Sequence, residues 1–297
     1  MNRIEVLTVD TPSLGDRSYV VHDGLVAFVV DPQRDIDRVL ALLERHGVEP
    51  AHVFETHIHN DYLTGGLALA RATGAAYHVN AEDDVAFERS PIRDGETVAV
   101  GPRMRVTALA TPGHTFTHLS YTLTDAEDGS TLAVFSGGSL LYGATGRPDL
   151  LGPEHTRDLA RLQHGSAHKL ARLLPDGTGV FPTHGFGSFC SSTQSDADES
   201  TIGRERQVNS VLVQDEETWV QELLDGLGAY PAYYAHMASS NAAGPGAPDL
   251  SPPSVADAAE LRRRIDTGEW VVDLRQRKLF AAGHAPGSLN FGLDGSF

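Results

Sequence analysis

Short runs of strand-forming residues alternate with amphipathic helical segments, and this alternation constrains the fold more than any other feature of the chain. The runs are rich in Val, Thr and Phe, and most end in Gly, Pro or Asp, as strands do. They cover residues 4–10, 25–31, 52–56, 104–110 and 131–137. Helical patterns lie between them at 36–47, 66–74 and 153–174. Strands that alternate with helices indicate an α/β layer fold.

The composition is that of a globular protein with little attraction for polyanions. Hydrophobic residues make up 40% of the 297 residues, which is enough for a sizeable core. The formal net charge of −17 argues against nucleic acid or an anionic membrane surface as a partner. Cys190 is the single cysteine, so no internal disulfide can form, and no apolar run approaches a membrane span. We therefore expect a cytoplasmic protein, with the oligomeric state left open, a homodimer included.

The strongest local signal is the segment VFETHIHNDYLTGG at 53–66. His57, His59 and Asp61 follow a strand at spacings of two, so in extended backbone their side chains point to the same side. Ligands gather outside the carboxyl ends of strands in α/β sheets. The segment therefore predicts a metal site, with Asp61 and Tyr62 as candidate catalytic residues beside the ligands.

Two more histidines share this strand-end position. His114 follows the strand 104–110 in a Pro-Gly turn, and His184 follows the strand-like residues VFPT. We expect His57, His59 and His114 to bind one divalent metal ion, iron(II) or zinc, with His184 nearby in a catalytic role. Three neutral imidazoles and an open position suit zinc, whereas iron(II) oxygenases use two histidines and a carboxylate.

Several motifs together resemble the metallo-β-lactamase superfamily over residues 1–240. They are the HxHxD loop, TPGHT about 55 residues later, FSGGSLLYGATGRPDL and PTHG. The GRPDL at 146–150 and the GRERQVN at 203–209 are similar to the persulfide dioxygenase and glyoxalase II group. The resemblance implies an αββα sandwich with the metal at one edge of the two sheets.

Two positions depart from the pattern of this group. The group reads THxHxDH, but this chain has Tyr62 in place of the last histidine, and Gly138 stands where the group has the metal-binding Asp of FTGD. In two-metal members these are a second-site ligand and the bridging ligand, so their loss argues for a single ion. The same alignment predicts that Gly138→Asp together with Tyr62→His increases the metal content.

Arg147 and Cys190 are the candidates for contacts with the substrate. Arg147 can bind a substrate carboxylate through two parallel hydrogen bonds, or it can form a structural ion pair with Asp149. Cys190 follows a Gly-rich loop near His184 and is either a persulfide carrier or a small buried residue. Tyr62 either places its phenol over the metal or packs.

The last part of the chain has a different composition. Residues 241–255 are dense in Pro, Gly, Ser and Ala, which predicts a linker. The stretch VVDLRQRKLFAAGHAPGSLNF at 271–291 is similar to the first half of a rhodanese domain. Residues 256–297 are therefore expected to form an incomplete rhodanese-like α/β segment. They contain no cysteine, so we expect no sulfurtransferase activity from them.

The resemblance implies an enzyme that oxidises a small thiol persulfide, such as glutathione persulfide, with iron(II) and dioxygen. The rhodanese-like tail favours this reading, since rhodaneses handle sulfane sulfur. One alternative is a glyoxalase II-type hydrolase that cleaves a thioester with a metal-bound hydroxide. The other is a catalytically degenerate module that binds a thiol.

Overall fold

The computed structural model describes residues 3–192 and 197–292. The chain divides into two compact units, Met1–Pro248 and Asp249–Phe297. The first unit carries every candidate site residue named above.

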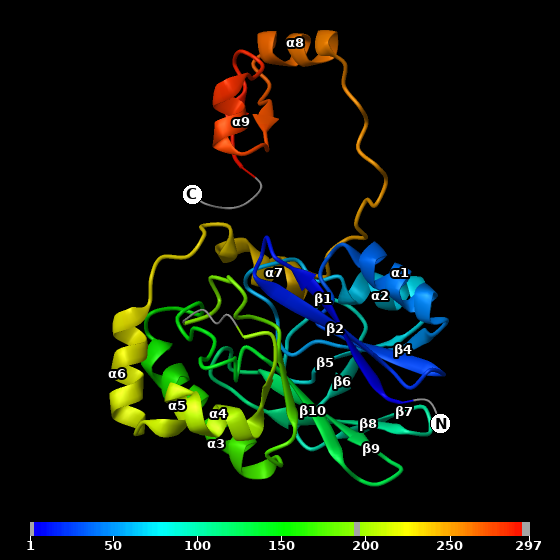
Figure 1. Ribbon diagram of the computed structural model, residues 1–297, viewed down its shortest axis with the longest axis vertical. Coiled ribbons are helices and arrows are strands. Elements are labelled where there is room, and N and C mark those ends of the chain that lie inside the picture. The colour runs from blue at the N-terminus through cyan, green and yellow to red at the C-terminus, as the bar shows by residue number, and fades with distance from the viewer. Residues whose placement is uncertain (1–2, 193–196, 293–297) are drawn as a thin grey trace. The chain divides into compact units, whose positions relative to one another are not determined.

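Two six-stranded sheets form the centre of the first unit (Figure 1). In the first sheet the strands lie side by side in chain order, antiparallel from β1 to β3 and parallel from β3 to β6: β1 (Glu5–Thr11), β2 (Asp16–His22), β3 (Val26–Val30), β4 (Glu49–Phe54), β5 (Ala76–Asn80) and β6 (Ser90–Ile92).

The second sheet has the order β12-β11-β10-β9-β8-β7. Its pairs are antiparallel except for β10 and β11, which run parallel. The strands are β7 (Thr97–Val100), β8 (Met104–Ala110), β9 (Leu119–Asp125), β10 (Thr131–Gly137), β11 (Gly179–Pro182) and β12 (Ser200–Thr201). All five strands expected from the sequence are present, with ends within a few residues of those expected.

Alternating side chains build the core between the sheets. In β8, Met104, Val106 and Ala108 are buried while the residues between them are partly exposed. They pack with Phe28 and Phe135 from the facing strands in one hydrophobic cluster. This two-sheet core requires each sheet to be covered on its outer face.

Helices supply that cover on both sides (Figure 1). The first sheet is covered by α1 (Ile36–His46) and α2 (Gly66–Thr73), which share a second hydrophobic cluster with it. Against the second sheet pack α3 (Thr156–Leu173), α4 (Ile202–Val208), α5 (Ser210–Val213) and α6 (Glu216–Gly226). The αββα sandwich expected from the sequence is thus confirmed.

One further helix, α7 (Tyr234–Ala243), ends the folded part of the first unit. Asn241 lies within the expected linker, yet it is buried in the first unit. Residues 244–257 follow without helix or strand. In the parts of the chain that the structure describes, no helix has both the length and the apolar character needed to cross a membrane.

The second unit is small and mostly exposed. It contains α8 (Ala258–Asp266), β13 (Val272–Asp273), α9 (Arg277–Ala282) and β14 (Leu289–Asn290), and its two strands pair in parallel. Trp270 is 81% exposed, and Leu274 and Phe291 are about half exposed. The unit therefore leaves apolar side chains in contact with water.

Candidate metal centre

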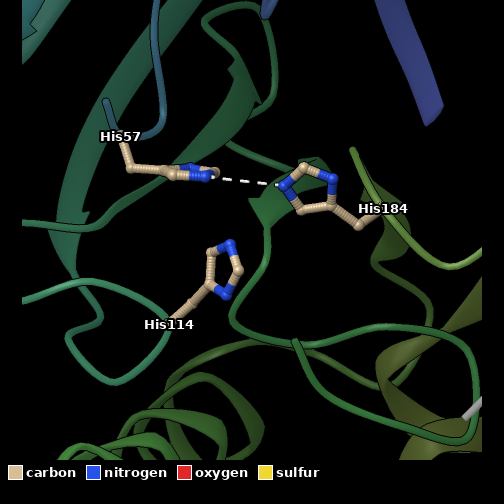
Figure 2. A group of neighbouring side chains, drawn as sticks. All are labelled: His57, His114 and His184. Atoms are coloured by element: carbon tan, nitrogen blue, oxygen red, sulfur yellow. Dashed lines mark hydrogen bonds between the residues drawn. The ribbon is translucent and has the colours of Figure 1, made fainter. Parts of the chain in front are cut away.

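Four histidines that follow strand ends meet at one edge of the sandwich. His57 and His59 follow β4, His114 follows β8, and His184 follows β11. All four side chains are buried. In Figure 2 the rings of His57, His114 and His184 surround a common space. Strand-end placement, which the sequence predicted, is therefore what brings them together.

Two groups of ligand-type side chains share this space. In each group the ligand atoms lie within 4.8 Å of one another: His57, His114 and His184 form one, and His59, Asp61 and His184 form the other. The Nε2 atoms of His57 and His184 are 3.5 Å apart. The geometry thus groups His57 and His114 with His184 rather than with His59, and His184 belongs to both groups.

His114 sits in a slot between two glycines. Its Nδ1–H donates to the carbonyl of Arg147 at 2.9 Å, so in the neutral ring Nε2 is left as the free acceptor. A Cβ on Gly138 would lie 2.3 Å from the ring carbon Cδ2, and a Cβ on Gly146 would lie 2.7 Å from Nδ1. Burial lowers the pKa of His114 to about 3, which keeps the ring neutral and able to bind a metal.

His184 is held by two carboxylates. Its Nδ1 bonds to Asp16 at 2.9 Å and lies 3.2 Å from an oxygen of Asp61. Burial would lower the pKa of His184, but the charges of Asp61 and Asp16 outweigh burial and raise the pKa to about 10. A metal ion at Nε2 would therefore take the place of one proton of this ring, while Nδ1–H would still donate to Asp16. A histidine whose outer nitrogen donates to a carboxylate has its ring direction fixed, as metal-binding histidines do. Asp16 belongs to no motif that would have predicted this contact.

His59 is held on its Nε2 side by three groups. That nitrogen is 3.1 Å from Glu55, 3.4 Å from Asp31 and 3.0 Å from the hydroxyl of Tyr62. Its Nδ1 has no hydrogen-bond partner and lies 4.0 Å from Asp61. The phenol of Tyr62 therefore contacts the outer side of His59, whereas the sequence left open a place over the metal.

Asp31 joins the two sheets beneath the site. Its carboxylate accepts hydrogen bonds from the backbone and hydroxyl of Thr56, both at 2.7 Å, and from the hydroxyl of Thr183. Burial would raise the pKa of Asp31, but His59 outweighs burial and lowers the pKa. Asp31 has a φ of 49°, the left-handed region that non-glycine residues rarely adopt. Such backbone strain often occurs at functional sites.

The donor set fits a divalent metal ion. His114 Nε2, His59 Nδ1 and both oxygens of Asp61 are buried without a hydrogen-bond partner. Leaving a buried polar atom unpaired costs about 1–3 kcal/mol, so a ligand that accepts these lone pairs would stabilise the site. His57 is held at Nδ1 by Thr56 at 2.8 Å, which directs its Nε2 toward His184. Imidazole and carboxylate suit zinc and iron.

Side-chain amides and a carboxylate from the helices hold the loops that carry these ligands. Gln163 of α3 donates to the carbonyls of Gly138 and Ser139, both at 2.8 Å. Asn209, in the GRERQVN motif, donates to the carbonyls of Leu141 and Ala144. Glu205 of the same motif accepts a hydrogen bond from the backbone N–H of Gly143 at 2.9 Å. That motif therefore shapes the loop that leads to Gly146 and the His114 slot.

Arg147 has the structural role that the sequence left open. Its guanidinium makes two hydrogen bonds with Asp149, at 2.7 and 2.8 Å, and donates to the carbonyls of Phe189 and Gly228. It also lies 4.7 Å from the centre of the Tyr230 ring. With these partners in place, the side chain is committed to joining loops and is not presented to a substrate carboxylate.

Cys190 is fully buried. Burial, followed by the charges of Asp61 and Asp16, raises the pKa of its thiol. A protonated thiol is a poor nucleophile. These properties match the small buried residue that was one of its two interpretations.

His118 lies directly under the site. Its Nε2 accepts the N–H of Gly138 at 3.0 Å, and its ring stacks on His57. It therefore supports the turn at Gly138, with no inward-facing nitrogen left for a metal.

Comparison with known sequences places the chain among relatives with related names. No family model matches the chain. A hydroxyacylglutathione hydrolase of Pseudomonas entomophila is 32% identical over 212 residues, which cover 62% of this chain and 76% of that protein. The chain belongs to the metallo-β-lactamase superfamily, among its glyoxalase II-like members. A hydroxyacylglutathione hydrolase of Polaromonas sp. is also 32% identical, over 54% of this chain. The chain spans only 57% of the length of that relative and about half of a similar mouse protein.

Solved structures from the superfamily share the fold. A metallo-β-lactamase from Staphylococcus aureus superposes with a TM-score of 0.83 at 27% identity, over 98% of this chain and 85% of that one. ETHE1 from Myxococcus xanthus gives a TM-score of 0.68 at 25% identity, over 80% of this chain and 98% of that one.

The two departures from the superfamily pattern have structural consequences. At Gly138 the ring of His114 fills the space that a side chain would need, so a carboxylate cannot enter without displacing a ligand-type residue. At Tyr62 the side chain bonds to the outer nitrogen of His59. The expectation that Gly138→Asp with Tyr62→His would increase metal content therefore conflicts with the packing.

Proposed function

We propose that this protein is a metal-dependent hydrolase of a small thioester. The observation that carries the proposal is the group of His57, His114 and His184. Each ring is held at its outer nitrogen, by Thr56, Arg147 and Asp16 respectively, and each presents Nε2 to the common space. Three imidazoles with an open position are the ligand set of catalytic zinc sites.

The residues around this group suit hydrolysis. Zinc held there would supply Lewis acidity, which lowers the pKa of water and polarises a carbonyl. Asp61 is buried, its oxygens have no hydrogen-bond partner, and His184 lies 3.2 Å away. We assign to Asp61 the orientation of the attacking water, and to His184 a second role in orienting that carboxylate.

The substrate class rests on the relatives. Several curated relatives are named hydroxyacylglutathione hydrolase, which specifies a thioester of a small thiol. We therefore expect a hydroxyacyl thioester of glutathione or a similar thiol as the substrate. Since Arg147 is engaged by Asp149, another group must bind the substrate carboxylates.

A persulfide dioxygenase is the second candidate, and a different observation favours it. His59, Asp61 and His184 are two histidines and one carboxylate, the ligand set of non-haem iron(II) oxygenases. The likeness to ETHE1 also supports this candidate. In it, iron(II) replaces zinc and a small thiol persulfide replaces the thioester.

For the rest of the chain we propose that the linker, expected at 241–255, begins only after α7, at residue 244, and joins a catalytic domain that includes α7 to a rhodanese-like segment at 256–297. Support comes from the sequence resemblance at 271–291 and from the parallel pair β13 and β14 around α9. A sulfur-handling neighbour would suit a thiol-based substrate. The segment itself has no cysteine with which to carry sulfur.

Metal analysis followed by two assays tests the proposal. The protein is purified without added metal, and zinc and iron are measured per chain. The zinc-loaded protein should hydrolyse a hydroxyacyl-glutathione thioester and take up no oxygen with glutathione persulfide. Oxygen uptake by the iron-loaded protein without thioester hydrolysis by either form would replace the hydrolase with the dioxygenase. If the protein holds no metal and shows neither activity, the remaining candidate is the non-catalytic module that binds a thiol.

A further inference from the structure

We propose that Asn241 is a positioning residue for the metal loop, which we define as residues 59–64. Asn241 lies near the end of α7, far along the chain from the loop, in a stretch whose composition is that of a linker. The proposal deepens the proposed function, since it rests on the metal site of that function.

The amide of Asn241 bonds to the loop backbone at three places. Its Nδ2 donates to the carbonyls of His59 at 2.9 Å and Tyr62 at 2.8 Å. Its Oδ1 accepts the N–H of Thr64 at 3.0 Å. Both N–H donors of the amide are therefore used, and the side chain is 1% exposed. A single side chain thus fixes both ends of the metal loop.

This clamp matters because the atoms of the loop that face the metal space have few constraints of their own. Both oxygens of Asp61 and the Nδ1 of His59 have no hydrogen-bond partner. The direction of the Asp61 carboxylate therefore depends on the backbone that carries it and on its ion pair with His184, at 3.2 Å. Metal–ligand distances tolerate a deviation of only about 0.2 Å, so a loop that drifts by more than this loses its place in the site.

The helix that carries Asn241 is itself anchored beside the loop. The carbonyl of Ala242 accepts the N–H of Ala86 at 2.8 Å. The backbone of Gly244 packs so closely on Phe87 that a Cβ there would lie 3.0 Å from that ring. Because α7 is fixed by these contacts, Asn241 can hold the loop in place and does not simply follow it.

Two substitutions separate hydrogen bonding from packing. Asn241→Asp keeps the size of the side chain and an acceptor for Thr64, but it places an oxygen against the carbonyls of His59 and Tyr62. Asn241→Ala removes all three bonds. The matched control on the same helix is Ser239→Ala, whose exposed hydroxyl bonds only within α7, to the carbonyl of His236.

Three measurements on the full chain test whether Asn241 holds the metal loop in place. Zinc affinity is measured by competition with a chelator, the ligand geometry by the absorption spectrum of the cobalt(II)-loaded protein, and the loop by hydrogen exchange of a peptide over 57–66 without metal. We expect both Asn241 variants to bind zinc about 10- to 100-fold more weakly, as losses of outer-shell partners do. Their cobalt spectra should change and their loop amides should exchange faster, while Ser239→Ala matches the parent.

Asn241→Asp with parental zinc affinity and parental exchange would overturn the proposal, even if Asn241→Ala fails to fold. Should the parent bind no zinc, the proposed function fails by itself. Hydrogen exchange alone then tests the role of Asn241. Unchanged exchange of the loop amides in the Asp variant would refute that role, and faster exchange would support it.

Discussion

Replacing Gly138 with alanine should strongly weaken metal binding by displacing His114. The added Cβ would lie 2.3 Å from the His114 Cδ2 and 3.0 Å from its Nε2. Carbon atoms in contact normally stay about 3.5 Å apart, so the ring must move by about 1 Å. On its other side the ring is confined by Gly146 and by its hydrogen bond to the Arg147 carbonyl.

A shift of this size exceeds the tolerance of a metal bond several times over. We expect zinc affinity to fall by at least about 100-fold, more than the loss of an outer-shell partner gives. Crowding of a packed core adds a loss of about 1–3 kcal/mol in the free energy of unfolding without metal. Zinc affinity is measured by chelator competition and stability by chemical denaturation of the metal-free protein.

Gly165→Ala is the matched control for this variant. Gly165 lies inside α3, and a Cβ there would meet nothing within 4 Å. The same change should leave zinc affinity unaltered and stabilise the helix by up to about 1 kcal/mol. If Gly138→Ala retained parental zinc affinity, His114 would not be a ligand in the position described, and the three-histidine group would have to be abandoned.

Burial, with the neighbouring His52, lowers the pKa of His78 to about 4. As the pH falls, the unfolded chain takes up this proton before the folded chain does. The contribution of His78 to stability is therefore complete above about pH 6.5 and is lost as the pH falls toward 4. His78→Gln should therefore reduce the stability lost between pH 7 and pH 5 by about 2 kcal/mol in urea titrations at each pH, and an unchanged loss would contradict this. Arg147→Ala leaves Asp149 without its partner and should lower the unfolding free energy by about 3 kcal/mol in thermal and urea denaturation, and a loss under 1 kcal/mol would show that the pair is dispensable. Elemental analysis of the zinc-saturated protein should give one tightly bound ion per chain, because the two ligand groups share His184, and two tight ions would disprove the shared-ligand description. Limited proteolysis should cut first within 244–257, where the chain has neither helix nor strand, and mass spectrometry of the fragments would show an earlier cut if α7 were not firmly packed.

The placement of the site could be predicted from the sequence, because it depends on local patterns. His57, His114 and His184 each follow a recognisable strand, and strand ends gather at one edge of a sheet. Which histidine completes the group with His57 and His114 could not be predicted in this way. Whether His59 or His184 joins the other two depends on which nitrogen of each ring is occupied, and Glu55 and Asp16 decide that from positions with no motif of their own.

The remaining surprises come from packing between distant segments. The loss of a carboxylate at Gly138 is visible in the sequence, but the entry of the His114 ring into that space is not. Composition marks Asn241 as part of a flexible linker, since its neighbours are Ser, Ala, Gly and Pro. Its burial results from the fit of α7 against the metal loop, which no local pattern records.

The contacts of Asn241 also limit how the two units can be recombined. Because α7 completes the metal loop, a gene fusion that joins a new partner upstream of residue 241 would separate the loop from its clamp. Joints placed after Pro248, where the first unit ends, would keep the loop intact. The C-terminal module can therefore be exchanged, in evolution or by engineering, only at a joint that follows α7. The functional border of the catalytic module lies beyond the point where its composition changes.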